Sequence, residues 1–276
     1  MAITAAEVNK LRQQTGAGMM DCKNALVEAN GDFEAAIDIL RKKGQKIAAK
    51  RGENDASEGL VLAQVTADGK TGVVLALNCE TDFVAKNEGY MKLVQSFLNI
   101  ALTNLPASAE ELKALAYDDK LTVADKMTEQ IGVIGEKLDL ASYAVVNADK
   151  VVAYNHPGNQ LATLVGVNSG SDVAEDAGRQ VAMQVAAMNP IALNKDGVDA
   201  RTIEREIEVG KDLAIQEGKP VDMAEKIAQG RLAKFFKENT LLSQEFIRDN
   251  KLTVEAFLDS TEKGLTVTEF KRIALS

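Results

Sequence analysis

Tryptophan is absent from the 276-residue sequence, histidine occurs once, cysteine occurs twice, and aromatic residues make up only 4% of the chain. A core must therefore be built mainly from Ala, Val, Ile, Leu and Met. A histidine-rich metal site is impossible with His156 alone, and Cys22 and Cys79 lie too far apart in the sequence to be a good frame for zinc. We expect neither a metal nor a cofactor.

A surplus of basic residues and long apolar runs are also missing. The formal net charge is −9, whereas a protein that binds nucleic acid directly normally needs excess Lys and Arg to displace counterions from phosphates. We interpret the basic run 41–51 as the solvated end of a helix, in preference to a phosphate-binding patch. The sequence contains no secretory signal, membrane-spanning run, P-loop or dinucleotide-binding glycine motif. These absences predict a cytoplasmic protein with reduced thiols, no membrane contact and no standard phosphate cradle.

Residues 1–52 are predicted to form three helices of about ten residues each, joined by tight turns. Thr4 and Glu7 make a capping box, and Asp32 is a plausible N-cap for the third helix. The apolar residues recur at helical spacing; they are Val8, Leu11, Met19, Cys22, Ala25, Leu26, Ala29, Phe33, Ala36, Ile37 and Leu40. Such a bundle has little core and is typical of a docking unit.

After a polar linker, the pattern changes to a β-hairpin and a helix. Residues 60–66 and 71–78 are rich in Val and Leu, with a turn between them. The helix that follows has an inward stripe of Tyr90, Leu93, Val94, Phe97, Leu98 and Ala101. Residues 107–137 indicate further helix.

The same order of elements recurs about ninety residues later. Residues 151–155 and 161–168 are predicted strands around a turn, and the helix after them stops before Pro190. Its predicted inward residues are Val181, Val185 and Met188. When the two copies are aligned, the matched pairs are Asn78 with Asn168, Thr81 with Ser171, Asp82 with Asp172, Val84-Ala85 with Val173-Ala174, and Gly89 with Gly178. Phe83 has no counterpart in this alignment.

The sequence therefore predicts an α+β protein with a duplicated α+β core and a helical hairpin inserted into the second copy. The expected domains are 1–52 for the three-helix module, 53–140 for the first core, 141–196 with 240–276 for the second, and 197–239 for the hairpin. In the last segment, residues 265–270 alternate like a strand, which we place on the second core. The hairpin either docks on its own core or joins two copies of the chain.

The apolar seams of the hairpin are narrow. One seam consists of Ile203, Ile207, Leu213 and Ala214, and the other of Met223, Ile227, Leu232 and Phe235. Gly210 and Gly230 are expected to interrupt these seams, and Gly218-Lys219-Pro220 separates the two helices.

The segment 78–87 carries the sharpest functional signal. It joins a strand to a helix, and either Thr81 or Asp82 can cap that helix with a side-chain oxygen. Because the second copy makes the same turn without an aromatic residue, the turn does not require Phe83. An aromatic side chain at such a tip is suited to anchoring in a pocket of a partner.

The sequence resembles the bacterial elongation factor Ts family from residue 1 to about 247. The resemblance rests first on Thr15-Gly16-Ala17-Gly18-Met19-Met20-Asp21-Cys22-Lys23 and on Thr81-Asp82-Phe83-Val84-Ala85. Further matches are Ile134-Gly135-Glu136, Tyr154 with His156, Gly218-Lys219-Pro220, Ala224-Glu225-Lys226-Ile227 and Gly230-Arg231. Two departures are Ala141-Ser142, where the family often has arginines, and an ending at Ser276 without the family's acidic segment and final helix.

The resemblance implies a guanine nucleotide exchange factor that binds elongation factor Tu and is not an enzyme. It implies that Asp82 and Phe83, flanked by Thr81 and Val84, enter the partner's GTP-binding domain and disturb its magnesium and phosphate site. It also implies a UBA-like N-terminal module and a coiled-coil hairpin used for dimers or 2:2 complexes. We further expect partner contacts from Arg12, Met19, Met20 and His156, although His156 could instead only close its hairpin turn.

Two alternatives remain at this stage. A hydrolase could use Cys79, His156 and an aspartate, either Asp82 or Asp172, but nothing in the sequence indicates an oxyanion hole. A generic adaptor would explain a docking module fused to a duplicated domain. It would not explain the match at Thr81–Val84.

Overall fold

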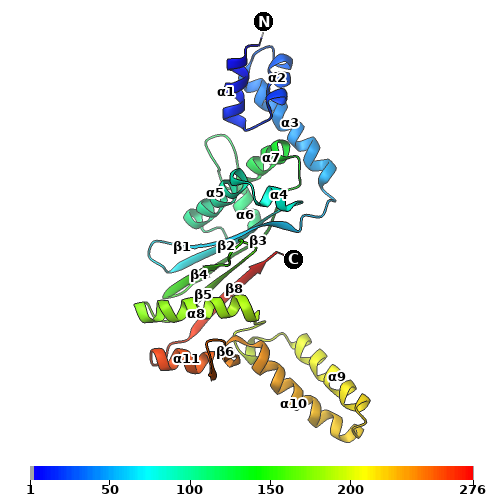
Figure 1. The fold of residues 1–276 in the computed structure, drawn as a ribbon, viewed down its shortest axis with the longest axis vertical. Coiled ribbons are helices and arrows are strands. Elements are labelled where there is room, and N and C mark those ends of the chain that lie inside the picture. Colours follow the sequence, from blue (N-terminus) through cyan, green and yellow to red (C-terminus); the bar gives the residue numbers. More distant parts are fainter. Residues whose placement is uncertain (1–2, 276) are drawn as a thin grey trace.

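Two three-stranded antiparallel sheets lie face to face in the computed structural model, which describes residues 3–275 (Figure 1). The first sheet contains β1 (Glu58–Val65), β2 (Thr71–Cys79) and β3 (Asp139–Asn147) in that order. The second contains β4 (Lys150–Asn155), β5 (Leu161–Val167) and β8 (Val267–Ala274). Both predicted hairpins are confirmed, and the strand expected near residues 265–270 pairs with β5 in the second core.

Strand β3 was not predicted from the sequence. It crosses residue 140, where we expected the first core to end, and it pairs with β2 from Thr71↔Asn147 to Asn78↔Asp139. The first core therefore extends to residue 147. This edge strand is only partly buried, so its sequence lacks a clear apolar alternation. Its partner strand is also more than sixty residues away, and local sequence patterns do not reveal such a pairing.

Small aliphatic side chains fill the space between the sheets. The buried residues there are Val61, Ala63, Val74, Ala76, Val146, Val151, Ala162 and Leu164. Strands β2 and β5 are the central strands of their sheets. One face of each meets the opposite sheet and helices cover the other, so almost all of their side chains are buried. This double burial explains their nearly continuous apolar sequences.

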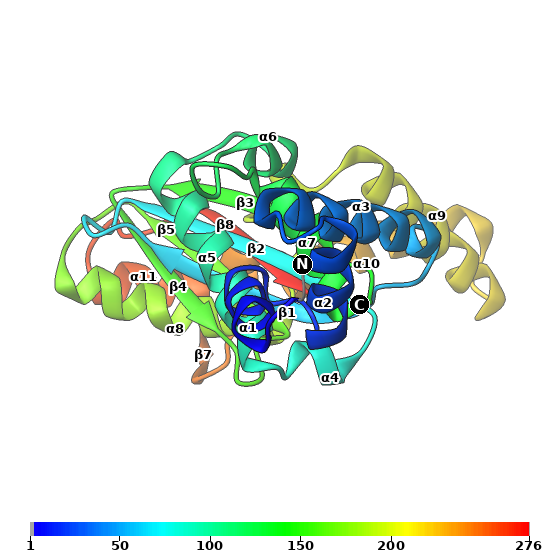
Figure 2. The same ribbon diagram turned by 90° about the horizontal axis from the view of Figure 1, so that it is seen from above.

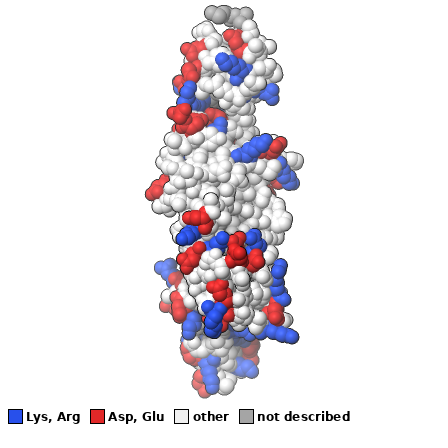
Figure 3. Space-filling view, turned by 90° about the vertical axis from the view of Figure 1, so that its left-hand side faces the viewer, with Lys and Arg blue, Asp and Glu red and all other residues white. Residues whose placement is uncertain are grey.

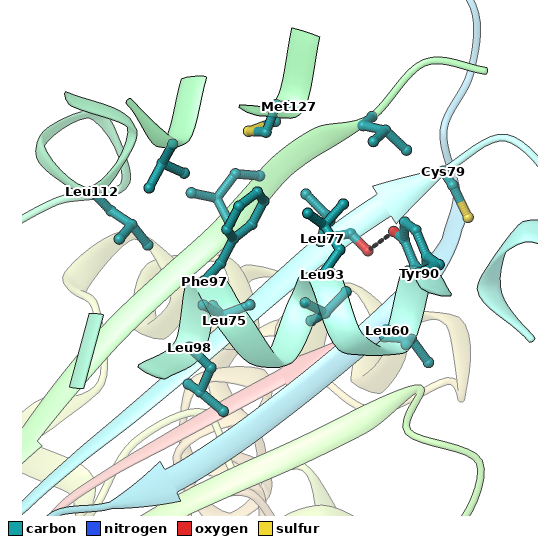
Figure 4. Packing of buried hydrophobic residues seen from close by; sticks show 14 of the residues in the cluster. Leu60, Leu75, Leu77, Cys79, Tyr90, Leu93, Phe97, Leu98, Leu112 and Met127 are labelled. Atoms are coloured by element: carbon teal, nitrogen blue, oxygen red, sulfur yellow. Dashed lines mark hydrogen bonds between the residues drawn. The ribbon is translucent and has the colours of Figure 1, made fainter. Parts of the chain in front are cut away.

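Helices cover the outer face of each sheet (Figure 1). The first sheet is covered by α5 (Glu88–Asn104), α6 (Ala109–Ala114) and α7 (Val123–Ile134), and the second by α8 (Asp172–Met188) and α11 (Val254–Thr261). In the first core, Leu93 and Phe97 of α5 pack with Leu75 and Leu77 (Figure 4). All six predicted inward residues of α5 are buried.

In α8, Val181 and Val185 are buried as predicted, whereas Met188 is 46% exposed. Met188 is the last residue of α8, and the left-handed conformation of Asn189 ends the helix directly after it. The prediction that Met188 points inward was therefore wrong, because the helix ends where the core ends.

The structure aligns the two copies differently from the sequence. The hairpins correspond as expected, with Asn78 matching Asn168. Helices α5 and α8, both 17 residues long, end in left-handed residues, Leu105 and Asn189, each followed by proline. Matching these ends superimposes all six buried positions of α5 on buried positions of α8. The offset is thus ninety residues at the hairpins and eighty-four at the helices, so the first copy contains six additional residues, not Phe83 alone.

The pairing of Gly89 with Gly178 in the sequence alignment is therefore wrong. Gly178 is buried, and a Cβ there would lie 3.0 Å from Val152 Cγ2. Gly89 is exposed in the first turn of α5. The two glycines have different structural roles.

The N-terminal module consists of α1 (Ala5–Thr15), α2 (Met19–Glu28) and α3 (Phe33–Arg51). The capping box of Thr4 with Glu7 and the N-cap at Asp32 are confirmed. Helix α3 is 19 residues long rather than about ten. Its second half carries the basic run on its exposed side and packs against α7, which accounts for the additional length.

The predicted helical hairpin is formed by α9 (Ala200–Gln216) and α10 (Val221–Asn239), which project away from the sheets (Figures 1 and 2). Small residues form the contact: a Cβ at Gly210 would lie 3.2 Å from the Cα and Cβ of Ala228. Gly210 therefore belongs to the seam instead of interrupting it, whereas Leu213 and Met223, both expected in the seams, are 39% and 50% exposed. Close approach of the two backbones leaves little room for long side chains between them.

Short elements at the base of the hairpin complete the second core. They are η1 (Lys195–Gly197), η2 (Leu241–Ser243), β6 (Glu245–Phe246) and β7 (Asp249–Thr253). Gln184 is fully buried there, donates to the Glu245 carbonyl (3.0 Å) and accepts from the Ile247 amide (2.9 Å). Across the described residues, none of the helices is long and apolar enough to span a membrane.

Acidic and basic side chains are interspersed rather than separated by sign. On the face shown in Figure 3, red and blue side chains alternate along most of the length, and a band across the middle carries few charges. Acidic and basic side chains also pair across the surface of the protein, for example Lys150 with Glu175 and Arg179 with Glu175.

A pair of glycine substitutions tests the contact between α3 and α7. A Cβ at Gly44 would lie only 2.6 Å from the backbone oxygen of Thr128, so we expect Gly44→Ala to lower the free energy of unfolding by about 1–3 kcal/mol. A Cβ at the exposed helical Gly230 meets nothing within 4 Å, so Gly230→Ala should raise it by about 0.5–1 kcal/mol. Urea unfolding measures both changes, and shifts of the same sign would contradict this packing.

Candidate functional site

The segment Thr81–Val84 forms most of a four-residue helix, α4 (Asp82–Ala85), between β2 and α5. Thr81 is the N-cap, and its Oγ1 accepts from the Val84 amide at 3.5 Å. Asp82, the other candidate cap, does not cap the helix. Its carboxylate accepts from the Lys86 ammonium at 2.6 Å instead, and this bond lowers the pKa of Asp82.

Phe83 and Val84 differ in burial on α4. Val84 is partly buried and packs against the core of the first sheet. Phe83 is 83% exposed, more than any other large apolar side chain of the described residues. Because burying a side chain of this size stabilises by about 1.5–3 kcal/mol, the fold gains nothing from leaving it in water. The geometry therefore separates two anchoring residues, Thr81 and Val84, from two outward residues, Asp82 and Phe83.

Glu136 fixes the backbone at the start of α4. One carboxylate oxygen accepts from the amides of Glu80 and Thr81, both at 3.1 Å, and the other accepts from the Thr81 hydroxyl at 2.7 Å. Glu136 follows the left-handed Gly135, which ends α7. In the second copy Ser171 caps α8 and donates to Glu262 in the same way. This contact therefore belongs to the duplicated fold.

The six additional residues of the first copy build α4 and its junction with α5. After α4, Asn87 starts α5 as a separate N-cap, accepting from the Gly89 amide at 2.8 Å. The second copy has no such break, because α8 begins directly after Ser171. The structure thus assigns to the first copy an additional helical turn that presents Phe83.

A groove lies beside this turn and reaches the N-terminal module. Its lining residues include Phe83, Val84, Tyr90, Gln130, Val133 and Gly16. Gly16 lies in the loop between α1 and α2, and Val133 also packs against the core of the N-terminal module. The module and α4 thus border one groove.

The remaining residues expected to contact a partner are exposed. Met19 and Met20, 54% and 63% exposed, lie at the start of α2, and Arg12 lies in the last turn of α1. His156 lies in the β4–β5 turn, where its Nδ1 is 3.0 Å from the Tyr154 hydroxyl.

The turn that contains His156 lies beside β1. The Val61 amide donates to the Asn159 carbonyl at 2.7 Å, and the Asn155 side chain bonds both the amide and the carbonyl of Ala63. Helix α4 also contacts β1. Arg12, Met19 and Met20 are thus on the N-terminal module, while His156 belongs to a turn of the second core that bonds to the first sheet through Asn155 and Asn159.

Comparison with known proteins identifies the family. A family model described as Elongation factor TS matches residues 80–276. The chain is 54% identical over 274 residues to the elongation factor Ts of Christiangramia forsetii, covering 99% of this chain and 98% of the relative. It is 48% identical over 276 residues to that of Porphyromonas gingivalis, covering 100% and 99%. The chain belongs to the elongation factor Ts family.

Members of the elongation factor Ts family are translation elongation factors that act as nucleotide exchange factors for elongation factor Tu, not as catalytic enzymes. The likeness to these relatives also extends to the end of the chain, beyond residue 247, where the matched motifs stopped.

The surroundings of Cys79 are unsuited to the nucleophile of the hydrolase alternative, in agreement with the family. Cys79 is fully buried, its thiol donates to the Thr81 carbonyl at 3.2 Å, and burial raises its pKa to about 11. A nucleophilic cysteine needs a thiolate and access to substrate. His156, the histidine of that alternative, is an exposed residue of the β4–β5 turn.

Thiol labelling checks this environment. In a Cys22→Ser variant, Cys79 should react with a thiol reagent at pH 8 at least about 100-fold more slowly than a free cysteine, because a pKa near 11 leaves little thiolate. In urea sufficient to unfold the chain, the rate should reach that of the free amino acid. Fast labelling of the folded protein would contradict the buried position of Cys79.

Proposed function

We propose that this chain releases GDP from elongation factor Tu during translation elongation in the cytoplasm by inserting Phe83 and Asp82 into the GTP-binding domain of that partner. The observation that carries the proposal is the exposure of Phe83 on an additional, capped helical turn. In this mechanism Phe83 enters an apolar site between helices of the partner, and the Asp82 carboxylate disturbs the groups that hold magnesium and phosphate.

Burial of Phe83 alone does not supply the free energy needed to accelerate GDP release. Acceleration of GDP release by about 10⁴-fold needs roughly 5.5 kcal/mol of differential interaction with the nucleotide-free partner. Burial of one phenylalanine supplies about 1.5–3 kcal/mol. Because coupling is reciprocal, the factor weakens nucleotide binding as much as nucleotide weakens binding of the factor. Additional docking surfaces must therefore hold α4 against the partner.

Two further surfaces are proposed for this docking. The UBA-like N-terminal module, residues 1–52, would bind the same domain of the partner through Arg12, Met19 and Met20, which are all exposed. The second core would bind another domain, with a contact from His156. Direct contact with nucleic acid is not part of this proposal.

Substitution of the two outward residues tests the mechanism. We expect Phe83→Ala to slow the release of labelled GDP from elongation factor Tu by roughly 10–100-fold, the equivalent of its lost burial. Asp82→Ala should slow it by about 3–10-fold, the value of a lost hydrogen bond. Met91→Ala, at an exposed apolar position of α5 outside the groove, is the matched control and should not change the rate. Unchanged rates for both Phe83→Ala and Asp82→Ala would refute the mechanism.

We propose that the helical hairpin, residues 197–239, is a coiled-coil module that joins two copies as a homodimer or as a 2:2 complex with the partner. Support comes from exposed apolar side chains on α9 and α10: Val209, Leu213, Ile215, Val221 and Met223. Their exposure leaves apolar area for a second chain to cover.

The oligomeric state provides the test. Sedimentation equilibrium should show concentration-dependent dimers of the full chain, and Leu213→Glu should shift the chain toward monomer because it places a charge in the apolar contact. Glu208→Gln, on the same helix, is a control that removes a charge. A monomer at the highest attainable concentration would reject this role for the hairpin.

A further inference from the structure

Glu80, the residue before Thr81, connects three parts of the chain. One carboxylate oxygen accepts from the Lys137 amide at 2.6 Å, at the start of the segment that leads into β3. The other accepts from the Arg51 guanidinium at 2.7 Å and from the Asn54 side chain at 2.9 Å. The Glu80 side chain is only 15% exposed. A largely buried carboxylate with three donors is held in one orientation.

The bonds of Glu80 and Glu136 are reciprocal. The Glu136 carboxylate accepts from the amides of Glu80 and Thr81, while the Glu80 carboxylate accepts from the amide of Lys137. Each of the two backbone segments thus supplies a carboxylate to the other. This double attachment restrains the start of α4 more strongly than either bond alone.

The second copy of the core shows which part of this arrangement the fold requires. Ser171 and Glu262 preserve the bond between the cap and a carboxylate. At the position that matches Glu80 in the hairpin alignment, however, the second copy has Gly170, which has no side chain to bond. The fold therefore forms its cap without a second carboxylate, and Glu80 occurs only in the copy that presents Phe83.

Glu80 also links α4 to the N-terminal module. Arg51 is the last residue of α3, the long helix of that module, and Asn54 lies just after it. The Lys137 ammonium strengthens this link by donating to the carbonyls of Gly52 and Asn54 at 2.9 and 3.0 Å. The end of α3, the linker and the start of α4 are thus joined at one point.

Burial by itself would raise the pKa of Glu80, but the bonds from Lys137, Asn54 and Arg51 lower it below its ordinary value. The carboxylate is therefore ionised at neutral pH and able to pair with Arg51.

We propose that Glu80 is a positioning residue of the exchange site, which fixes α4, and with it Phe83, relative to the N-terminal module. The inference rests on the proposed function above. When the module and α4 are held in register, both engage the partner at once, and no ordering of α4 is needed after docking. The conformational entropy of α4 is then lost when the protein folds, so ordering α4 does not weaken the complex that releases GDP.

The experiment measures the rate of labelled GDP release from elongation factor Tu over a range of concentrations of this protein. Glu80→Ala should lower the maximal rate about tenfold and change the half-saturating concentration less than about threefold, because the docking surfaces remain. Arg51→Ala removes the ion pair and leaves the Lys137 bond, so a decrease of about threefold is expected. This milder variant covers the case in which Glu80→Ala fails to fold.

A double substitution separates positioning from a general loss of structure. In the Phe83→Ala background, Glu80→Ala should lower the maximal rate less than about twofold, because the residue it positions is gone. Glu262→Ala is the matched control: it breaks the corresponding bond in the second copy and should lower the melting temperature without changing the maximal rate.

The two levels of the proposal fail differently. If Phe83→Ala alone leaves GDP release unchanged, the proposed mechanism is wrong, and a role for Glu80 in positioning Phe83 falls with it. If Phe83→Ala slows release but Glu80→Ala and Arg51→Ala do not, the positioning role is refuted and the mechanism stands. If Glu80→Ala also lowers the maximal rate about tenfold in the Phe83→Ala background, the proposal that Glu80 positions Phe83 is likewise refuted.

Discussion

The two sheets can lie face to face because the side chains between them are small. A Cβ at Gly72 would lie 2.7 Å from Val151 Cγ1 and 2.8 Å from Leu164 Cδ2, and one at Gly166 would lie 2.8 Å from Ala148 Cβ. Larger side chains, such as Phe97, are placed in the outer layers under the helices. This packing fixes the direction in which β2 ends, and therefore where the segment after β2 leaves the core.

The candidate site uses that exit point. Thr81 and Glu136 make the same contact as Ser171 and Glu262, so the duplicated fold supplies the start of a helix in both copies. The first copy adds one turn of helix there and places a phenylalanine on its exposed side. A rigid scaffold with a short addition at its surface is a common way to build a binding site, because the scaffold holds the addition at little entropic cost.

Much of this was predictable from the sequence. The capping box at Thr4, the hairpin turns and the apolar stripe of α5 follow from local patterns, because caps, turns and helical spacing depend on neighbouring residues. Phe83 was singled out by comparing the two copies within the sequence. The predictions were wrong where distant residues decide the outcome. Strand β3 depends on its pairing with β2, and the length of α3 depends on its contact with α7.

The sequence by itself determined the class of fold, the duplication, the family and the residue Phe83 on which the proposed function depends. Tertiary structure alone decided how much of the first copy is additional and what holds it. The first copy is longer than the second by six residues, not by one. Where each helix ends and which of its positions are buried determine this difference, and both depend on the tertiary structure. The contacts of Glu80 with Arg51 and Lys137 join residues far apart in the chain. No spacing in the sequence predicts them, because only folding brings those donors to one carboxylate.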